Sequence, residues 1–136
     1  MQPVRLQVDT TARAQMVDIT ERVREVVRAS GIASGLCHVF CPHTTAGVTV
    51  NENADPDVRH DLLLALENAV PAEAAAGRYR HGEGNSDAHV KASLVGASQL
   101  LPVEGGALAL GTWQGVFLCE FDGPRLRSVH VKVMAG

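Results

Sequence analysis

Residues 81–89, HGEGNSDAH, are the densest group of side chains in the chain that could do chemistry. Two histidines bracket two carboxylic acids and two glycines, with almost nothing apolar between them. The glycines exclude a regular helix or strand, so backbone N–H groups in this loop can bind an anion. Asp87 is a suitable N-cap for a helix over about 88–97, which places His89 in the first turn and His81 in the loop before it. This arrangement can bring both imidazoles into one site.

Two other polar groups stand where predicted strands end. His43 follows a strand over 35–41 and precedes two threonines and a glycine, in a turn where its side chain can face a cleft. The strand over 46–51 ends in the tripeptide NEN at 51–53, a carboxylate between two amides. We expect these two polar strand ends to meet at one place.

Three imidazoles, from His43, His81 and His89, would form a metal site with an open position. Imidazole nitrogen suits zinc or another transition metal, whereas magnesium prefers oxygen. Glu52 or Glu83 could orient an imidazole or take a proton from bound water. There are two alternatives. The same histidines could hydrogen-bond to nearby backbone in a stiff loop, or they could hold a phosphate or sulfate without metal, most strongly when protonated.

Glu120 interrupts the apolar strand VFLCEF and therefore needs a partner. Arg125 and Arg127 lie just across the turn at 122–124 and are the obvious choices. A structural ion pair is the plainer interpretation, and an arginine that also holds a phosphate is the alternative. Either arginine, together with Lys91, could supply positive charge to a phosphorylated ligand.

The composition is that of an ordinary globular protein, with 46% hydrophobic and 20% charged residues. At 136 residues the chain is expected to form a single domain over 1–136. A net charge of −3 leaves no basic excess for nucleic acid, although a small anion needs only a local cluster. No apolar run is long enough to span a membrane, and the first residues lack a signal-peptide core. The three cysteines match neither a disulfide framework nor a CxxC motif, so we expect a reduced, cytoplasmic protein.

The periodicity of the sequence predicts an α+β domain, a largely antiparallel sheet with two or three helices packed on it. Thr20 is the expected N-cap of a first helix that Gly31 ends, and Asp55-Pro56 should open a second. Because VFLCEF is apolar on both faces, the sheet should be covered on both sides, by helices, another sheet or another subunit. Strands are expected at 4–9, 14–19 (the hairpin partner of the first), 35–41, 46–51, 99–103, 107–110, 113–121 and 125–134.

Three ordered motifs resemble the YjbQ-like family of small bacterial and archaeal proteins, over about residues 5–134: HTTAGVTVNENADPDVRHDL, YRHGEGNSDAHVKASLVG and PVEGGALALGTWQGVFLCEFDGPRLR. The resemblance implies an α+β fold, a homotrimer with sites near its subunit interfaces, and a metal in some members. Some members are also credited with a weak, secondary thiamine-phosphate synthase activity, which joins a hydroxymethylpyrimidine diphosphate to a thiazole phosphate. The positions that match the family's marked residues are His43, Thr45, Glu52, Asn53, His81, Glu83, Gly84, Asn85, His89, Glu120 and Arg125.

The resemblance and the residues together favour a small metal-binding enzyme that acts on a small phosphorylated substrate. The expected roles are zinc ligation by His43, His81 and His89, catalysis by Glu52, Glu83 and Arg125, and cofactor binding by Thr45, Asn53, Gly84 and Asn85. Transfer of the thiamine-phosphate synthase kind and metal-dependent hydrolysis both remain open as the reaction. The alternative is a homotrimer that binds a metal, an anion or a metabolite without catalysis.

Overall fold

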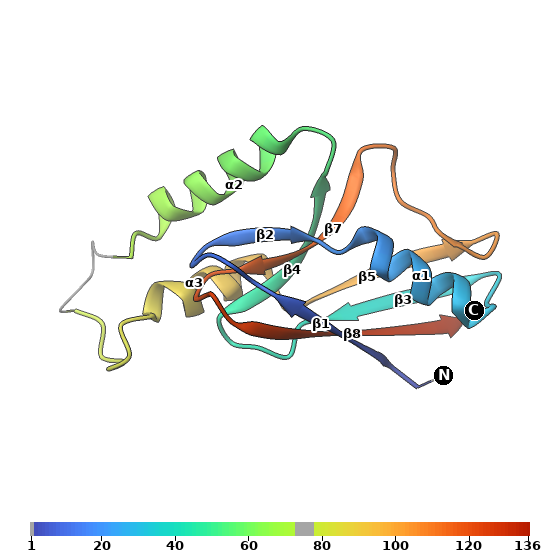
Figure 1. The fold of residues 1–136 in the computed structure, drawn as a ribbon, viewed down its shortest axis with the longest axis horizontal. Helices are drawn as coiled ribbons and strands as arrows, with labels where there is room; N and C mark the ends of the chain where they lie inside the picture. Colours follow the sequence, from blue (N-terminus) through green and yellow to red (C-terminus); the bar gives the residue numbers. More distant parts are fainter. Residues whose placement is uncertain (1, 73–77) are drawn as a thin grey trace.

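The computed structural model describes residues 2–72 and 78–136 (Figure 1). The fold is α+β, as predicted, with helices packed on antiparallel sheets. None of the helices in these two ranges is long and apolar enough to cross a membrane. The elements follow in the order β1 (Val4–Asp9), β2 (Gln15–Asp18), α1 (Thr20–Ser30), β3 (Gly35–Phe40), β4 (Ala46–Glu52), α2 (Pro56–Ala69), α3 (Ser86–Val95), β5 (Ser98–Glu104), β6 (Ala107–Leu108), β7 (Gln114–Glu120) and β8 (Leu126–Ala135).

The strands form two antiparallel sheets, the larger in the order β1-β8-β3-β5-β6 and the smaller in the order β2-β7-β4. The expected hairpin of the first two strands is wrong. β1 pairs with β8, whereas Gln15 of β2 lies opposite Glu120 of β7. The connection between β1 and β2 passes from one sheet to the other, and Thr10 N–H donates there to the carbonyl of Arg125 at 3.0 Å. Alternation of apolar residues determines which face of a strand is buried, but it does not choose the neighbouring strand.

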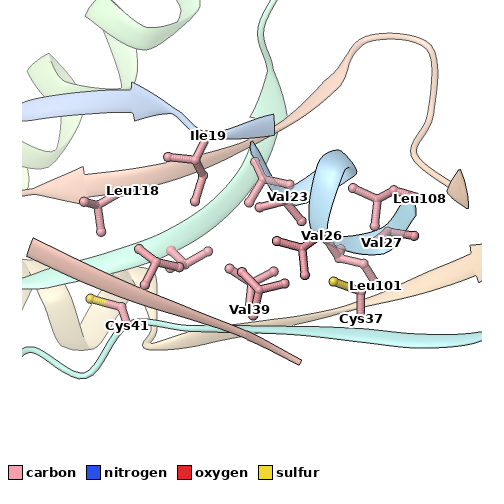
Figure 2. Packing of buried hydrophobic residues seen from close by; sticks show 14 of the residues in the cluster. Ile19, Val23, Val26, Val27, Cys37, Val39, Cys41, Leu101, Leu108 and Leu118 are labelled. Atoms are coloured by element: carbon pink, nitrogen blue, oxygen red, sulfur yellow. The ribbon is translucent and has the colours of Figure 1, made fainter. Parts of the chain in front are cut away.

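The main core lies between the two sheets and includes the inner face of α1 (Figure 2). Val23 and Val27 of α1 are fully buried in one cluster with Val39 of β3. Cys37 and Cys41 belong to the same cluster. Burial raises the pKa of the Cys37 thiol to about 11 and also raises that of Cys41. Both cysteines therefore act as small core hydrophobes rather than as nucleophiles.

The outer face of the smaller sheet is covered by helices. Phe117 and Cys119 of β7 form a second apolar cluster with Ala88 and Ala92 of α3, and leucines of α2 pack against it. The smaller sheet is thus covered on both sides, as VFLCEF predicts. Outward-facing positions of the larger sheet instead carry exposed apolar side chains, namely Leu36, Phe40, Leu100 and Met134.

The starts of the three helices agree with the sequence to different degrees. The side chain of Asp55 caps α2, as predicted. The prediction that Thr20 caps α1 is wrong, since Thr20 is the first residue of the helix, Ile19 has the cap position, and Asp18 Oδ1 accepts the Thr20 N–H at 2.9 Å. Gly31 ends α1 in a left-handed conformation, as predicted. α3 begins at Ser86, earlier than expected, so Asp87 lies inside its first turn instead of capping it.

Candidate functional site

A cavity of about 430 Å³ collects most of the residues that the sequence singles out. It lies where the segment after β3, the loop before α3, the first turn of α3 and the start of β8 come together. We call it the histidine cavity. Its lining consists of Pro42, His43, Thr44, Thr45, His81, Glu83, Asn85, His89, Asp122, Arg125 and Arg127.

His43 is held in place by the larger sheet. Its Nε2 accepts a hydrogen bond from Ser128 N–H of β8 at 2.9 Å. Burial and, after it, the positive charge of Arg127 hold the pKa of His43 below its ordinary value, so the imidazole is neutral at pH 7. A neutral imidazole that accepts at Nε2 carries its proton on Nδ1. His43 can therefore offer a ligand an N–H donor at Nδ1.

His81 and His89 form a pair at the loop and the first turn of α3. Their rings meet edge to face, with centroids 5.3 Å apart. Nε2 of His81 lies 3.6 Å from Oε2 of Glu83. Gly84 does not line the cavity, but its φ of +72° is a left-handed conformation that favours glycine, and it lets the loop turn between the two histidines. The prediction that the loop brings His81 and His89 together is confirmed.

The three histidines border one cavity, but they do not form a metal site as they stand. Over residues 2–72 and 78–136, no three His, Cys, Asp or Glu side chains are grouped so that they could hold a metal ion. In addition, Nε2 of His43 already accepts the Ser128 N–H, so this nitrogen is not free to bind a metal as the side chain stands. Zinc ligation by His43, His81 and His89 stays a prediction.

A buried ion pair between Glu120 and Arg127 forms part of the wall of the histidine cavity, because Arg127 lines it. Glu120 is 0% exposed and Arg127 is 4% exposed. Arg127 Nε donates to Glu120 Oε1 at 2.8 Å, and its Nη2 donates to Glu120 Oε2 and to Thr45 Oγ1. Burial alone would raise the pKa of Glu120, but hydrogen bonds from Arg127, from Asp122 N–H and from Thr10 outweigh it and hold the pKa below its ordinary value. The predicted ion pair of Glu120 is confirmed, with Arg127 as the partner.

Arg125 and Asp122 form the outer rim of the cavity. Arg125 Nη2 lies 3.0 Å from Asp122 Oδ2, and the arginine side chain is 53% exposed. Asn85 Nδ2 donates to the same carboxylate oxygen at 2.8 Å. Asn85 Oδ1 is buried and has no hydrogen-bond partner in the described part of the chain. The sequence reasoning missed Asp122, whose only signal was its place in the turn between Glu120 and the two arginines.

Glu52 and Asn53 lie at the opposite end of β4 from the histidine cavity. β4 has seven residues, so its two ends are about 20 Å apart. Glu52 Oε2 accepts the N–H of Asp55 at 3.3 Å, and Asn53 Nδ2 donates to Asp18 Oδ2 at 3.2 Å. The prediction that the two polar strand ends meet at one place is therefore wrong within one chain, because β4 extends between them. The catalytic role of Glu52 and the binding role of Asn53 stay predictions.

Lys91 does not line the histidine cavity, although the sequence suggests it as a source of positive charge there. It is 4% exposed. Its Nζ donates to Asp87 Oδ2 at 3.0 Å and to Glu67 of α2. Arg13, between β1 and β2, donates to Asp87 Oδ1 at 3.1 Å. Lys91 thus belongs to a structural network that joins α3 to α2 and to the crossing between the sheets.

A larger cavity, of about 930 Å³, lies between β1 and α1. The described residues that line it include no histidine or cysteine. Arg28 in its wall pairs with Glu25 at 2.8 Å on an exposed face of the helix. The side chains suited to chemistry therefore gather at the smaller, histidine cavity.

Comparison with known proteins finds relatives that match this chain over nearly its whole length. Residues 4–136 match the family described as UPF0047 protein YjbQ-like. The chain is 53% identical to the UPF0047 protein YugU of Bacillus subtilis over 129 residues, covering 95% of this chain and 96% of that protein. A UPF0047 protein of Methanocaldococcus jannaschii is 46% identical over 128 residues, or 94% of this chain and 91% of that protein.

Solved structures show the same similarity. A YjbQ/UPF0047 protein of Clostridium acetobutylicum superposes with a TM-score of 0.92 at 51% identity, covering 96% of this chain and 99% of that one. A YbjQ-like protein of unknown function from Sulfolobus solfataricus gives a TM-score of 0.93 at 33% identity, covering 98% and 96% of the two chains. The chain therefore belongs to the YjbQ-like UPF0047 family.

Proposed function

We propose that the histidine cavity is the active site of a small enzyme that acts on a small phosphorylated substrate. The observation that carries the proposal is the convergence of three imidazoles and two guanidinium groups on one cavity of about 430 Å³. A cavity of this size suits a metabolite. Guanidinium groups match the geometry of phosphate oxygens, and imidazoles can move protons near neutral pH.

The residues take different roles in this proposal. Arg125 binds the phosphate, because its guanidinium group is half exposed at the rim, whereas Arg127 is buried against Glu120. His43 donates from Nδ1 to a phosphate oxygen. His81 and His89 transfer protons, with Glu83 close enough to orient His81.

Replacing Arg125 by alanine is expected to weaken the binding of sulfate, a stable mimic of a phosphate group, by about 10- to 100-fold. A hydrogen bond to a charged group contributes roughly 1.5–3 kcal/mol, which corresponds to that loss of affinity. Titration calorimetry of the wild type and of Arg125→Ala measures the change. Arg28→Ala is the matched control, since Arg28 is an exposed arginine of α1 paired with Glu25.

The same titration has an informative pH dependence. Among the described residues that line the cavity, Arg125 and Arg127 are matched by Glu83 and Asp122, so the formal charges cancel while the imidazoles are neutral. The pKa of His43 is held below its ordinary value of about 6.5, so its protonation makes the lining positive only below that pH, while sulfate keeps its charge. We therefore expect the affinity of the wild type for sulfate to rise as the pH is lowered below about 6.5. An affinity of the wild type that stays constant as the pH is lowered, together with an unchanged affinity of Arg125→Ala, would contradict an anion site.

Zinc binding is a separate proposal, supported by the contact between His81 and His89 and by the nearby Glu83. His43 would have to release Ser128 N–H to act as a third ligand. Zinc added to metal-stripped protein at neutral pH is expected to bind once per chain, and the double variant His81→Ala/His89→Ala is expected not to bind it. His60→Ala, which removes an exposed imidazole on α2, should leave the titration unchanged. Zinc binding that survives the double substitution would place the metal elsewhere.

Two assays distinguish between the candidate reactions, hydrolysis and transfer of the thiamine-phosphate synthase kind. Release of phosphate from a panel of phosphomonoesters tests hydrolysis. A mixture of hydroxymethylpyrimidine diphosphate and thiazole phosphate tests a secondary thiamine-phosphate synthase activity, for which the support is the family. Both assays are run with and without zinc. Sulfate binding without turnover in either assay would favour the alternative, a protein that binds an anion or metabolite without catalysis.

A homotrimer in the cytoplasm also remains a proposal. The exposed Leu36, Phe40, Leu100 and Met134 on the larger sheet support contact with other copies, and the buried, unpaired cysteines suit a reducing compartment. Light scattering at micromolar concentration distinguishes a trimer from a monomer.

A further inference from the structure

A second cavity, of about 520 Å³, adjoins the histidine cavity. The two share His43, Thr44 and His89 in their linings. The remaining residues that line the second cavity have small side chains or none, and we call it the small-residue cavity. They are Ala46, Ala92, Ser93, Gly96 and Ala97.

The chemistry of the small-residue cavity differs from that of its neighbour. Apart from the shared histidines, its described lining holds no ionisable side chain. The Ser93 hydroxyl already donates to the carbonyl of His89 at 2.9 Å. The carbonyls of Gly96 and Ala97 accept from Val48 N–H and Cys41 N–H at 3.0 and 2.7 Å. A charged group placed here would lose water without gaining a partner, so the cavity suits an uncharged group.

The floor of the small-residue cavity is a fixed part of the fold. The two backbone bonds to Gly96 and Ala97 tie the end of α3 to β4 and to the end of β3. Gly47 lies so close to this segment that a Cβ there would stand 2.6 Å from the carbonyl oxygen of Gly96. Ala92 is buried in the apolar cluster under α3. The cavity therefore exists in the folded chain without any rearrangement.

We propose that the two cavities bind the two parts of one ligand: a phosphate group in the histidine cavity and a compact, uncharged group, such as a planar ring, in the small-residue cavity. This inference rests on the proposed function, and it adds the class of substrate. His43 and His89 border both cavities, so they lie at the junction between the phosphate and the uncharged group. The small side chains at 92, 93, 96 and 97 set the size of that group.

The test compares inorganic phosphate with phenyl phosphate, which adds a single uncharged ring. The wild type is expected to bind phenyl phosphate at least about tenfold more tightly, because the ring buries apolar surface in the small-residue cavity. Ala97→Leu fills this cavity and should reduce the affinity for phenyl phosphate to that for phosphate, while phosphate affinity stays unchanged. Ser93→Leu provides a second filling variant, and Ala65→Leu, on the exposed face of α2, is the matched control.

The outcomes separate this inference from the proposed function. Equal affinity of the wild type for the two ligands would overturn the two-part ligand and leave the phosphate site standing. No binding of either ligand would refute the proposed function itself. An unchanged preference for phenyl phosphate in folded Ala97→Leu and Ser93→Leu would also overturn the inference. If these variants instead change the oligomeric state and not the preference, the small-residue cavity is covered by a second copy of the chain.

Discussion

Replacing Glu120 by alanine is expected to lower the free energy of unfolding by about 3–5 kcal/mol, because it leaves the Arg127 guanidinium buried without its counter-ion. Arg127 donates to both carboxylate oxygens, and Thr10 donates to one of them. No other carboxylate in the described part of the chain bonds to Arg127, so the charge cannot find a substitute. Urea unfolding at pH 7 measures the loss, at a fixed chain concentration in case the protein is oligomeric.

Two further variants make the experiment on Glu120 decisive. Glu104→Ala removes an exposed carboxylate at the end of β5 and should change stability by less than about 0.5 kcal/mol. Glu120→Leu combined with Arg127→Met removes both charges and should recover most of the lost stability, since apolar residues of similar volume can replace a buried pair. If Glu120→Ala alone unfolds like the wild type, the ion pair contributes no net stability.

The stabilising effect of Glu120 should also depend on pH. Its folded-state pKa lies below its ordinary value, so the unfolded chain takes up the proton first as the pH falls. The contribution is fully present above the unfolded pKa, about 4.3, and is lost as the pH falls through the folded pKa. The difference between the wild type and Glu120→Ala should therefore be largest near neutral pH.

Replacing Lys91 by methionine is expected to cost about 3–5 kcal/mol at pH 7 and less at pH 4.5. Lys91 is buried and donates to Asp87, which is only 1% exposed. Burial alone would raise the pKa of Asp87, but the hydrogen bonds from Lys91 and then from Arg13 outweigh it and hold the pKa below its ordinary value. Without Lys91 only Arg13 still opposes the effect of burial, so the pKa of Asp87 should rise and the carboxyl group can escape part of the penalty by taking up a proton.

The control for this prediction is the chain's other lysine, Lys132, which is exposed on β8. Lys132→Met should change the free energy of unfolding by less than about 0.5 kcal/mol at either pH. A penalty for Lys91→Met that stays constant between pH 7 and pH 4.5 would show that lost packing of the lysine stem, rather than the charge on Asp87, causes the loss.

Much of the fold could be predicted because burial imposes a period on the sequence. β3, β4, β7 and β8 follow their predicted ranges closely, and Asp55-Pro56 opens α2 as capping chemistry requires. The partner of β2 could not be predicted, because antiparallel strands with similar apolar faces can exchange neighbours without changing any local pattern. The prediction that Asp87 caps α3 is wrong, because its carboxylate lies inside the first turn of the helix and accepts a buried hydrogen bond from Lys91.

The candidate site was predictable to a similar extent. The meeting of His81 and His89 could be predicted, because the two residues are close in the sequence. His81 lies in the loop before α3, and His89 lies in the first turn of that helix. His43 reaches the same cavity because β3 ends beside β8. Glu52 follows His43 closely in the sequence, but the extended strand β4 lies between them and holds them at its opposite ends. Sequence proximity across a strand is therefore a poor guide to proximity in a site.

The wall of the histidine cavity is shared between the two sheets, since Glu120 ends β7 of the smaller sheet and Arg127 lies on β8 of the larger one. We therefore expect the proposed binding site to form only in molecules whose two sheets are docked, and partly opened states to bind no ligand. Occupancy would add its free energy to the global unfolding transition, about 2.7 kcal/mol at a ligand concentration of 100 times Kd. The protection should extend to the slowest-exchanging backbone amides of both sheets as well as to the loop that carries the histidines.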